Sequence, residues 1–171
     1  MNRSINLQNL ASIAEITGAA AILVTLIYLA IQTNQNTEAI QANTRQAMIA
    51  ADQALLNQVI EFPEIDEYYY KTDLSDREMR RLSVFLLQLV RLRETYWLQY
   101  QTGAIDDKTW KSYRESLIYT FSTPRTRQWW NNAVSETTMF DSGFVKEMER
   151  RLAETPILDS QFHIEAFRDT Q

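Results

Sequence analysis

A chain of 171 residues is long enough for one modest domain, and its content of 45% hydrophobic and 11% aromatic residues is enough to build a packed core. Lys and Arg number 17 against 22 Asp and Glu, a net charge of −5 with no basic stripe, so we expect no nucleic-acid partner. The absence of Cys excludes disulfides and thiolate chemistry.

The most apolar segment runs from Leu10 to Ile31 and reads LASIAEITGAAAILVTLIYLAI. It has no charge from Ile16 to Ile31, and counted from Ile13 it has about 19 residues, near the ~20 that a helix needs to cross a bilayer core. A removed signal peptide is one alternative, but the residues YLA near its end match a cleavage site poorly. A buried core helix is another, but such a helix normally keeps a polar face. We therefore predict a transmembrane helix.

Small residues recur through this segment at alternating steps of three and four. In lipid, a seam of small residues lets two helix backbones approach closely, and packing then drives their association. We therefore expect a homo-oligomer in contact with membrane lipid. The predicted helix-association seam consists of Ala11, Ala14, Gly18, Ala21, Thr25 and Tyr28.

Polar residues in and after the span leave a second possibility open. Glu15 lies two residues inside Ile13, where its carboxylate either reaches the headgroup zone or faces a partner helix or a water-filled path. Gln32 and Gln35 continue the 3–4 spacing into an Asn- and Gln-rich stretch, which is either a solvated helix face or a ring of amides around a pore. Glu15, Gln32 and Gln35 are therefore candidate lumen or partner-contact residues.

The positions of helix-breaking Gly and Pro residues predict the remaining organisation of the chain. No Gly or Pro occurs between Gly18 and Pro63, so the helix is expected to continue past the membrane to about residue 61. We predict an all-α fold, in which one N-terminal transmembrane helix continues as a long helix into a small helical bundle. The predicted parts are an N-terminal segment (1–9), the transmembrane helix (10–31), a juxtamembrane helix (32–61), a helical soluble domain (62–156) and a C-terminal tail (157–171).

Capping residues divide the predicted soluble domain into helices. Ser75 and Glu78 form a capping box, and a Pro at a first helical position follows Thr123. The predicted helices are a short one over 64–71, one from Asp76 to about Tyr100, one from Asp106 or Asp107 to about Phe121, one from Pro124 that carries Trp129 and Trp130, and one from Asp141 or Ser142 that ends before Pro156.

The helix that begins at Asp76 carries charged residues in an otherwise apolar middle. Arg91 and Glu94 are spaced i,i+3 beside several aromatic residues. They are either a structural ion pair or part of a ligand pocket to which Trp129 contributes. Trp129 and its neighbour Trp130 are about 100° apart around a helix, so we expect one to face inward and the other outward.

Motifs for catalysis are absent from the sequence. There is one His, His163, in the tail, and the close carboxylates Glu64, Asp66 and Glu67 do not share one helical face. Only 3 Gly are present, and none belongs to a phosphate-binding loop, a nucleophile elbow or a zinc-protease motif. We therefore expect no enzyme, no cofactor and no metal site.

The chain resembles a widespread family of uncharacterised bacterial proteins through YLAIQTNQNT at the end of the span, RLSVFLLQLVRLRETYWLQY, and PRTRQWW. Family members have one N-terminal span that ends in Y-L-A-x-Q-x-x-Q-N-T and an all-helical domain with a late Trp pair. The resemblance extends to about Leu152 and implies a single-pass protein of the bacterial inner membrane. It implies no activity and no catalytic residue.

The side of the membrane on which the soluble domain lies is weakly encoded. Arg3 precedes the span and the next basic residue is Arg45, which favours an external domain. Family members often have a basic residue directly after the span, where this chain has Thr33, and such a residue favours a cytoplasmic domain. We lean slightly to the cytoplasmic side.

Three functions follow as hypotheses. The leading one is a single-pass membrane protein that self-associates and presents a helical scaffold or interaction domain. The second is a homo-oligomeric channel or pore. The third is a ligand-sensing or accessory subunit of a membrane complex, with Arg91, Glu94 and Trp129 near its pocket.

Overall fold

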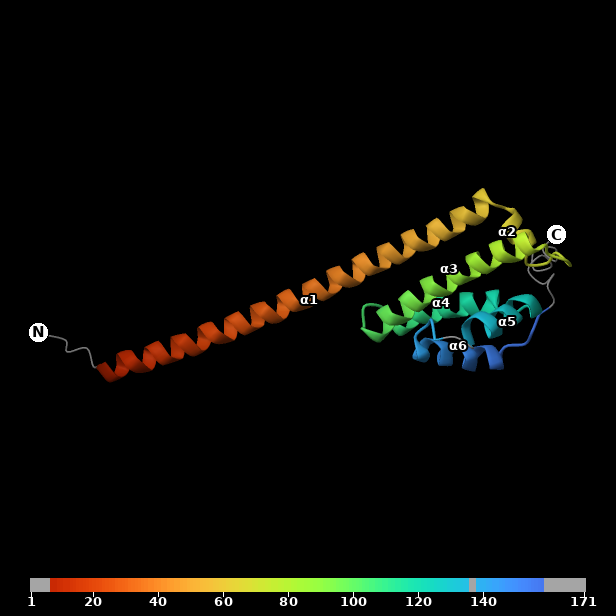
Figure 1. Cartoon of the computed structure of the whole chain (residues 1–171). Coiled ribbons are helices and arrows are strands. Elements are labelled where there is room, and N and C mark those ends of the chain that lie inside the picture. The colour runs from red at the N-terminus through yellow and green to blue at the C-terminus, as the bar shows by residue number, and fades with distance from the viewer. Residues whose placement is uncertain (1–6, 136–137, 159–171) are drawn as a thin grey trace, which may run out of the picture. The chain divides into compact units, whose positions relative to one another are not determined.

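The computed structural model describes residues 7–135 and 138–158, with side chains from Asn9 onward (Figure 1). These residues form helices and no strand, which confirms the predicted all-α fold. The chain divides into two compact units, Met1–Asn43 and Thr44–Gln171. We describe each unit by itself. His163 and most of the predicted tail lie outside the described residues.

The first helix, α1 (Leu7–Glu61), contributes to both units. Its first part begins with the apolar segment, and its last part, from Thr44, belongs to the second unit. The helix ends just before Pro63, because Pro has no backbone N–H and disfavours helical geometry in the residue that precedes it. The prediction that the apolar helix continues to residue 61 is therefore confirmed.

Two helices follow, α2 (Glu64–Glu67) and α3 (Asp76–Gln101), and α3 has the ends expected from its sequence. At its start the Ser75 side chain accepts from the Glu78 backbone, and the Glu78 carboxylate accepts from the Ser75 N–H, a complete capping box. At its end Gly103 adopts a φ of 74°, and the N–H of Ala104 donates to the carbonyl of Gln99, as in a Schellman motif.

The remaining helices are α4 (Asp107–Thr120), α5 (Pro124–Trp130) and α6 (Ser142–Glu154), each with a side-chain N-cap. Asp106 and Asp141 take the cap from the two candidates at each of their helices, and α5 begins at Pro124 as predicted. Asp106 accepts from the N–H of Thr109 at 2.8 Å, and Asp141 accepts from Gly143 and Phe144, both at 2.9 Å. The π-helical turn at Asn131–Ser135, which follows α5 directly, has no signal in the sequence pattern.

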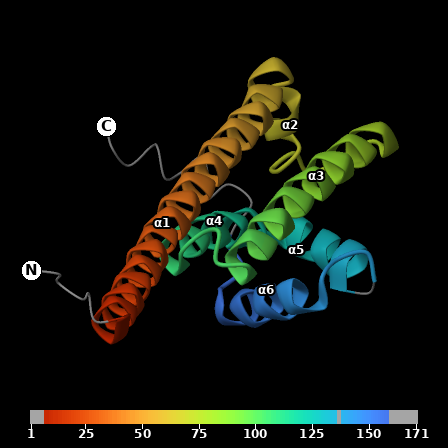
Figure 2. The same ribbon diagram turned by 90° about the vertical axis from the view of Figure 1, so that its left-hand side faces the viewer.

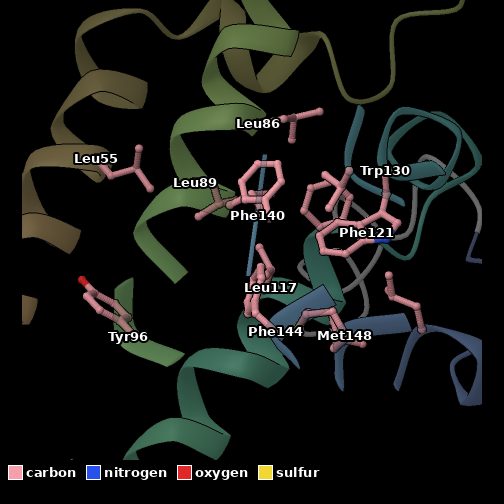
Figure 3. Packing of buried hydrophobic residues seen from close by; sticks show 14 of the residues in the cluster. Leu55, Leu86, Leu89, Tyr96, Leu117, Phe121, Trp130, Phe140, Phe144 and Met148 are labelled. Atoms are coloured by element: carbon pink, nitrogen blue, oxygen red, sulfur yellow. The ribbon is translucent and has the colours of Figure 1, made fainter. Parts of the chain in front are cut away.

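The core of the second unit lies between α3 and the three helices after it, which gather along one side of α3 (Figure 2). Aromatic and aliphatic side chains from each helix meet there (Figure 3). The rings of Trp110 and Trp130 both contact Phe144 with centroids 6.4 Å apart. The most deeply buried apolar residues include Leu86, Val90, Leu117, Phe121, Trp130, Val134, Phe144 and Met148.

Residues 44–61 of α1 pack against α3 within the second unit. Met48 and Leu55 are buried there, and Leu55 lies across from Leu89 (Figure 3). The Tyr96 hydroxyl donates to the Met48 carbonyl at 2.8 Å. Residues 44–61, which the sequence places in a juxtamembrane helix, are thus also a layer of the bundle.

Replacing Phe144 by Ala should lower the free energy of unfolding by roughly 3–5 kcal/mol, because the buried ring leaves a cavity among Trp110, Trp130 and Met148. Urea titration followed by Trp fluorescence measures this change, since all four Trp lie in the second unit. The matched control is Leu98→Ala, because Leu98 is exposed and should change stability by less than about 0.5 kcal/mol. Equal effects of the two variants would contradict the described core.

Candidate functional site

The apolar segment of α1 has no contact that removes it from solvent in its own unit. Every side chain from Leu10 to Ile31 is exposed. An 18-residue window of this helix reaches a mean hydropathy of 2.0, and none of it is buried. By length and composition α1 is therefore able to cross a membrane, a property that it shares with N-terminal signal sequences.

The polar side chains inside this segment form hydrogen bonds with their own helix. Between Ile16 and Ile31 the only polar side chains belong to Thr17, Thr25 and Tyr28. The two threonine hydroxyls donate to the carbonyls four residues earlier, each at 2.8 Å, and the Tyr28 hydroxyl accepts from the Gln32 amide at 2.9 Å. The two threonine hydroxyls therefore have an acceptor within their own helix and need no water as a partner.

The residues of the helix-association seam are all exposed. At Gly18 an added Cβ would meet no atom of the chain within 4 Å. Glu15 and Gln35 are likewise exposed, and Gln32 contacts Tyr28 as described. The surface along the seam is thus open to a partner helix.

Arg91 and Glu94 of α3 contact each other and the backbone segment that precedes α6. The Arg91 guanidinium donates to the Glu94 carboxylate at 2.8 Å and to the Met139 carbonyl at 2.7 Å, and it lies 4.2 Å from the centre of the Phe140 ring. Glu94 also accepts from the backbone N–H of Asp141. Of the two alternatives, the structural ion pair describes these residues, and neither lines any of the cavities described below.

The buried arginine of α3 is Arg93, which the sequence analysis did not single out. Its side chain is 6% exposed and lies 2.6 Å from Asp52 on α1, whereas the Arg91 side chain is 46% exposed. The Arg93 guanidinium also lies over the rings of Tyr96 and Tyr113. Burial, with the nearby Asp52 carboxylate, raises the pKa of the Tyr96 hydroxyl. The spacing of the buried stripe Leu82, Leu86, Leu89, Arg93 and Tyr96 would have identified Arg93.

Trp129 lines a separate cavity of about 590 Å³, to which neither Arg91 nor Glu94 contributes. Its indole N–H donates to the Ser83 hydroxyl at 2.6 Å, and the side chain is half-buried, while Trp130 is buried, as expected for neighbours on a helix. The wall of this cavity combines apolar and amide side chains, namely Leu74, Met79, Leu82, Gln128 and Asn132.

A second cavity, a groove of about 450 Å³, lies where the end of α1, α2 and the first half of α3 meet. Its apolar lining comes from Phe62, Ile65, Val84 and Phe85, and three arginines of α3 border it. We call it the arginine groove. The sequence analysis did not identify this groove, because its lining comes from three separate elements.

The described residues contain no group of three or more His, Asp or Glu side chains that could hold a metal ion. Comparisons of the chain with protein-family models, with curated proteins and with solved structures find no match. Arguments about function therefore depend on the geometry of the chain itself.

The role of Asp141 as the N-cap of α6 can be tested by substitution. The backbone N–H of Phe144, with further bonds from Trp97 and Gly143, holds the pKa of the Asp141 carboxyl below its ordinary value. Asp141→Ala should lower the free energy of unfolding by about 1 kcal/mol at neutral pH. Asp141→Asn is the matched control, because Asn caps nearly as well.

The pH dependence of this effect has a definite sign. A depressed folded-state pKa stabilises the fold fully above the unfolded value, about 3.9 for Asp, and this stabilisation is lost as the pH falls through the folded value. The difference between wild type and Asp141→Ala should therefore narrow below about pH 4 in urea titrations. A difference that stays constant or grows there would contradict the capping role.

Proposed function

We propose that the chain is a single-pass membrane protein that self-associates and presents its second unit as a helical scaffold or interaction domain. One observation carries the proposal: the apolar segment of α1 is exposed along its whole length, and its few hydroxyls bond to its own helix. In hydrocarbon every polar group needs a partner within the protein, and a helix that meets this need alone is suited to a bilayer.

The energetics support insertion rather than exposure to water. Eleven large apolar side chains between Leu10 and Ile31 are 49–70% exposed. Transfer of each from water to an apolar medium is worth about 1.5–3 kcal/mol when complete. Glu15 lies near one end of the segment, where a carboxylate reaches the headgroup zone more easily than at the centre.

Two features support self-association. The seam of small residues leaves a flat, unobstructed helix face at Gly18. In the second unit, residues 44–61 turn Met48 and Leu55 toward α3 but leave Ile49, Leu56 and Ile60 between 53% and 77% exposed. Ile49 and Leu56 fall on the same 3–4 repeat as the seam, so the repeat supplies apolar side chains for a second copy of the helix.

We further propose the bacterial inner membrane as the location, with the second unit on the cytoplasmic side. The family resemblance supports this placement, and the weak positive charge before the span opposes it. The homo-oligomeric channel stays a prediction, since Glu15, Gln32 and Gln35 require a second copy before they can enclose a lumen.

Membrane insertion predicts that the chain stays in the pellet after an alkaline carbonate wash and that the mature protein retains residues 10–31 by intact mass. The double variant Leu23→Arg/Ile27→Arg should move most of the protein to the supernatant, because each arginine near the bilayer centre is unfavourable by roughly 2.5–3.5 kcal/mol. The same change at exposed positions of the second unit, Leu98→Arg/Tyr119→Arg, serves as control. Release of the wild type into the supernatant would overturn the proposal.

Self-association through the seam predicts that Gly18→Leu/Ala21→Leu weakens cross-linked dimers and larger species roughly tenfold in phosphatidylcholine nanodiscs. An added Cβ at Gly18 lies in open space, so a loss of cross-linking reports on the partner. Ala19→Leu/Ala20→Leu adds a similar volume on the opposite helix face and should have no effect. Equal cross-linking in both double variants would exclude the seam as the interface.

A further inference from the structure

The arginine groove exposes apolar surface within a folded unit. Phe85 forms part of the buried core, but Phe62 and Val84 are 45% and 65% exposed at the groove. Leaving apolar surface in water is unfavourable by about 25 cal/mol per Å², so an apolar occupant of the groove gains this free energy on binding. The volume of about 450 Å³ lies within the range of roughly 300–1,000 Å³ that is typical of small-molecule sites.

Three arginines, Arg77, Arg80 and Arg81, border this apolar surface. The Arg81 guanidinium lies 3.0 Å from the Glu64 carboxylate, so its charge is compensated. Arg77 and Arg80 form no ion pair and no side-chain hydrogen bond with any residue that the structure describes. Two guanidinium groups without an ion-pair partner among the described residues therefore lie beside the apolar lining.

The position of these arginines is unfavourable for α3 itself. They lie in its first two turns, at the positive end of the helix dipole, and their i,i+3 and i,i+4 spacing makes them repel one another. In the same turn, Glu78 is engaged by Lys71 at 2.6 Å, and Asp76, which forms no ion pair with either arginine, offsets at most one of their two charges. Charges placed where they disfavour their own helix are among the local departures that are expected at binding sites.

We propose that the arginine groove binds a single-chain amphiphile with an anionic head. The apolar chain lies against Phe62, Val84 and Phe85, and a carboxylate head lies between Arg77 and Arg80. Guanidinium groups suit this head because their planar donors form paired hydrogen bonds with carboxylate oxygens. This ligand site goes beyond the proposed membrane function and does not depend on it.

The size of the groove favours such a ligand over larger partners. A docked amphipathic helix needs anchors at i, i+3 or i+4, and i+7, and a stable protein interface buries about 800 Å² on each side. The apolar lining here is four side chains, Phe62, Ile65, Val84 and Phe85.

Photochemical labelling tests the site on the full chain in phosphatidylcholine nanodiscs. The probe is dodecanoate with a diazirine at the chain end, and the chain-matched control is the corresponding alcohol. We expect saturable labelling of peptides that cover residues 58–65 and 77–88, competed by unlabelled dodecanoate. The alcohol should label these peptides about tenfold less, since it lacks the charge that the arginines recognise.

Variants test each half of the site. Arg77→Gln/Arg80→Gln should reduce labelling about tenfold, whereas Lys111→Gln/Lys146→Gln, which removes the same charge from exposed positions outside the groove, should leave it unchanged. Val84→Glu should abolish labelling without unfolding the domain, because Val84 is exposed, and Leu98→Glu on the same helix is its control.

Three results would overturn the proposal. The first is that the acid and the alcohol label the groove equally, or that the acid labels the arginine variant as strongly as it labels the lysine control variant. The second is labelling confined to residues 10–31, which reports only partition into the bilayer. The third is groove labelling that arises only after deletion of residues 159–171, which would make the chain's own tail the occupant. The carbonate and cross-linking results for the apolar segment are independent of all three.

Discussion

The exposure of the apolar segment of α1 is the constraint on which the behaviour of the chain depends. Its large aliphatic side chains from Leu10 to Ile31 have no partner in their own unit. The free energy at stake, a few kcal/mol for each side chain, is together comparable with the whole stability of a typical domain, about 5–15 kcal/mol. A bilayer removes this surface from water. The threonine hydroxyls already donate to carbonyls of their own helix, which lowers the desolvation free energy of the transfer.

Residues 44–61 of α1 combine two roles within the second unit. One face packs Met48 and Leu55 against α3, and the Asp52–Arg93 ion pair lies beside that packing. A buried ion pair adds little net stability because desolvation offsets its attraction, but a mispaired arrangement would leave a charge buried. The pair therefore helps to fix the register of these residues on α3, while Ile49 and Leu56 on another face stay available for a partner.

Two cavities coincide with departures from local rules of structure. The cavity beside Trp129 adjoins the π-helical turn at Asn131–Ser135, and such turns are often found at functional sites. The arginine groove coincides with cations in the first turns of α3, where the helix dipole disfavours them. Both cavities lie in the second unit, so its surface offers binding chemistry that is separate from the apolar segment.

Local signals in the sequence determined the helices, because caps and breakers act within a few residues of the backbone that they pair with. Ser75 caps α3, Pro124 begins α5, and the unbroken run before Pro63 forms one helix, all as predicted. At α4 and α6 the cap is one of the two candidates that the sequence offers. Hydrophobic content alone likewise determined the apolar segment as the candidate span.

Only the tertiary structure decided which side chains meet across helices. It placed Arg93, rather than Arg91, in the buried ion pair, and it separated Trp129 from Arg91 and Glu94. It also assembled the arginine groove from residues of α1, α2 and α3 and the turns between them. The reason is physical: helix formation depends on near neighbours in the chain, whereas pairing of helix faces depends on long-range packing, which local periodicity does not specify.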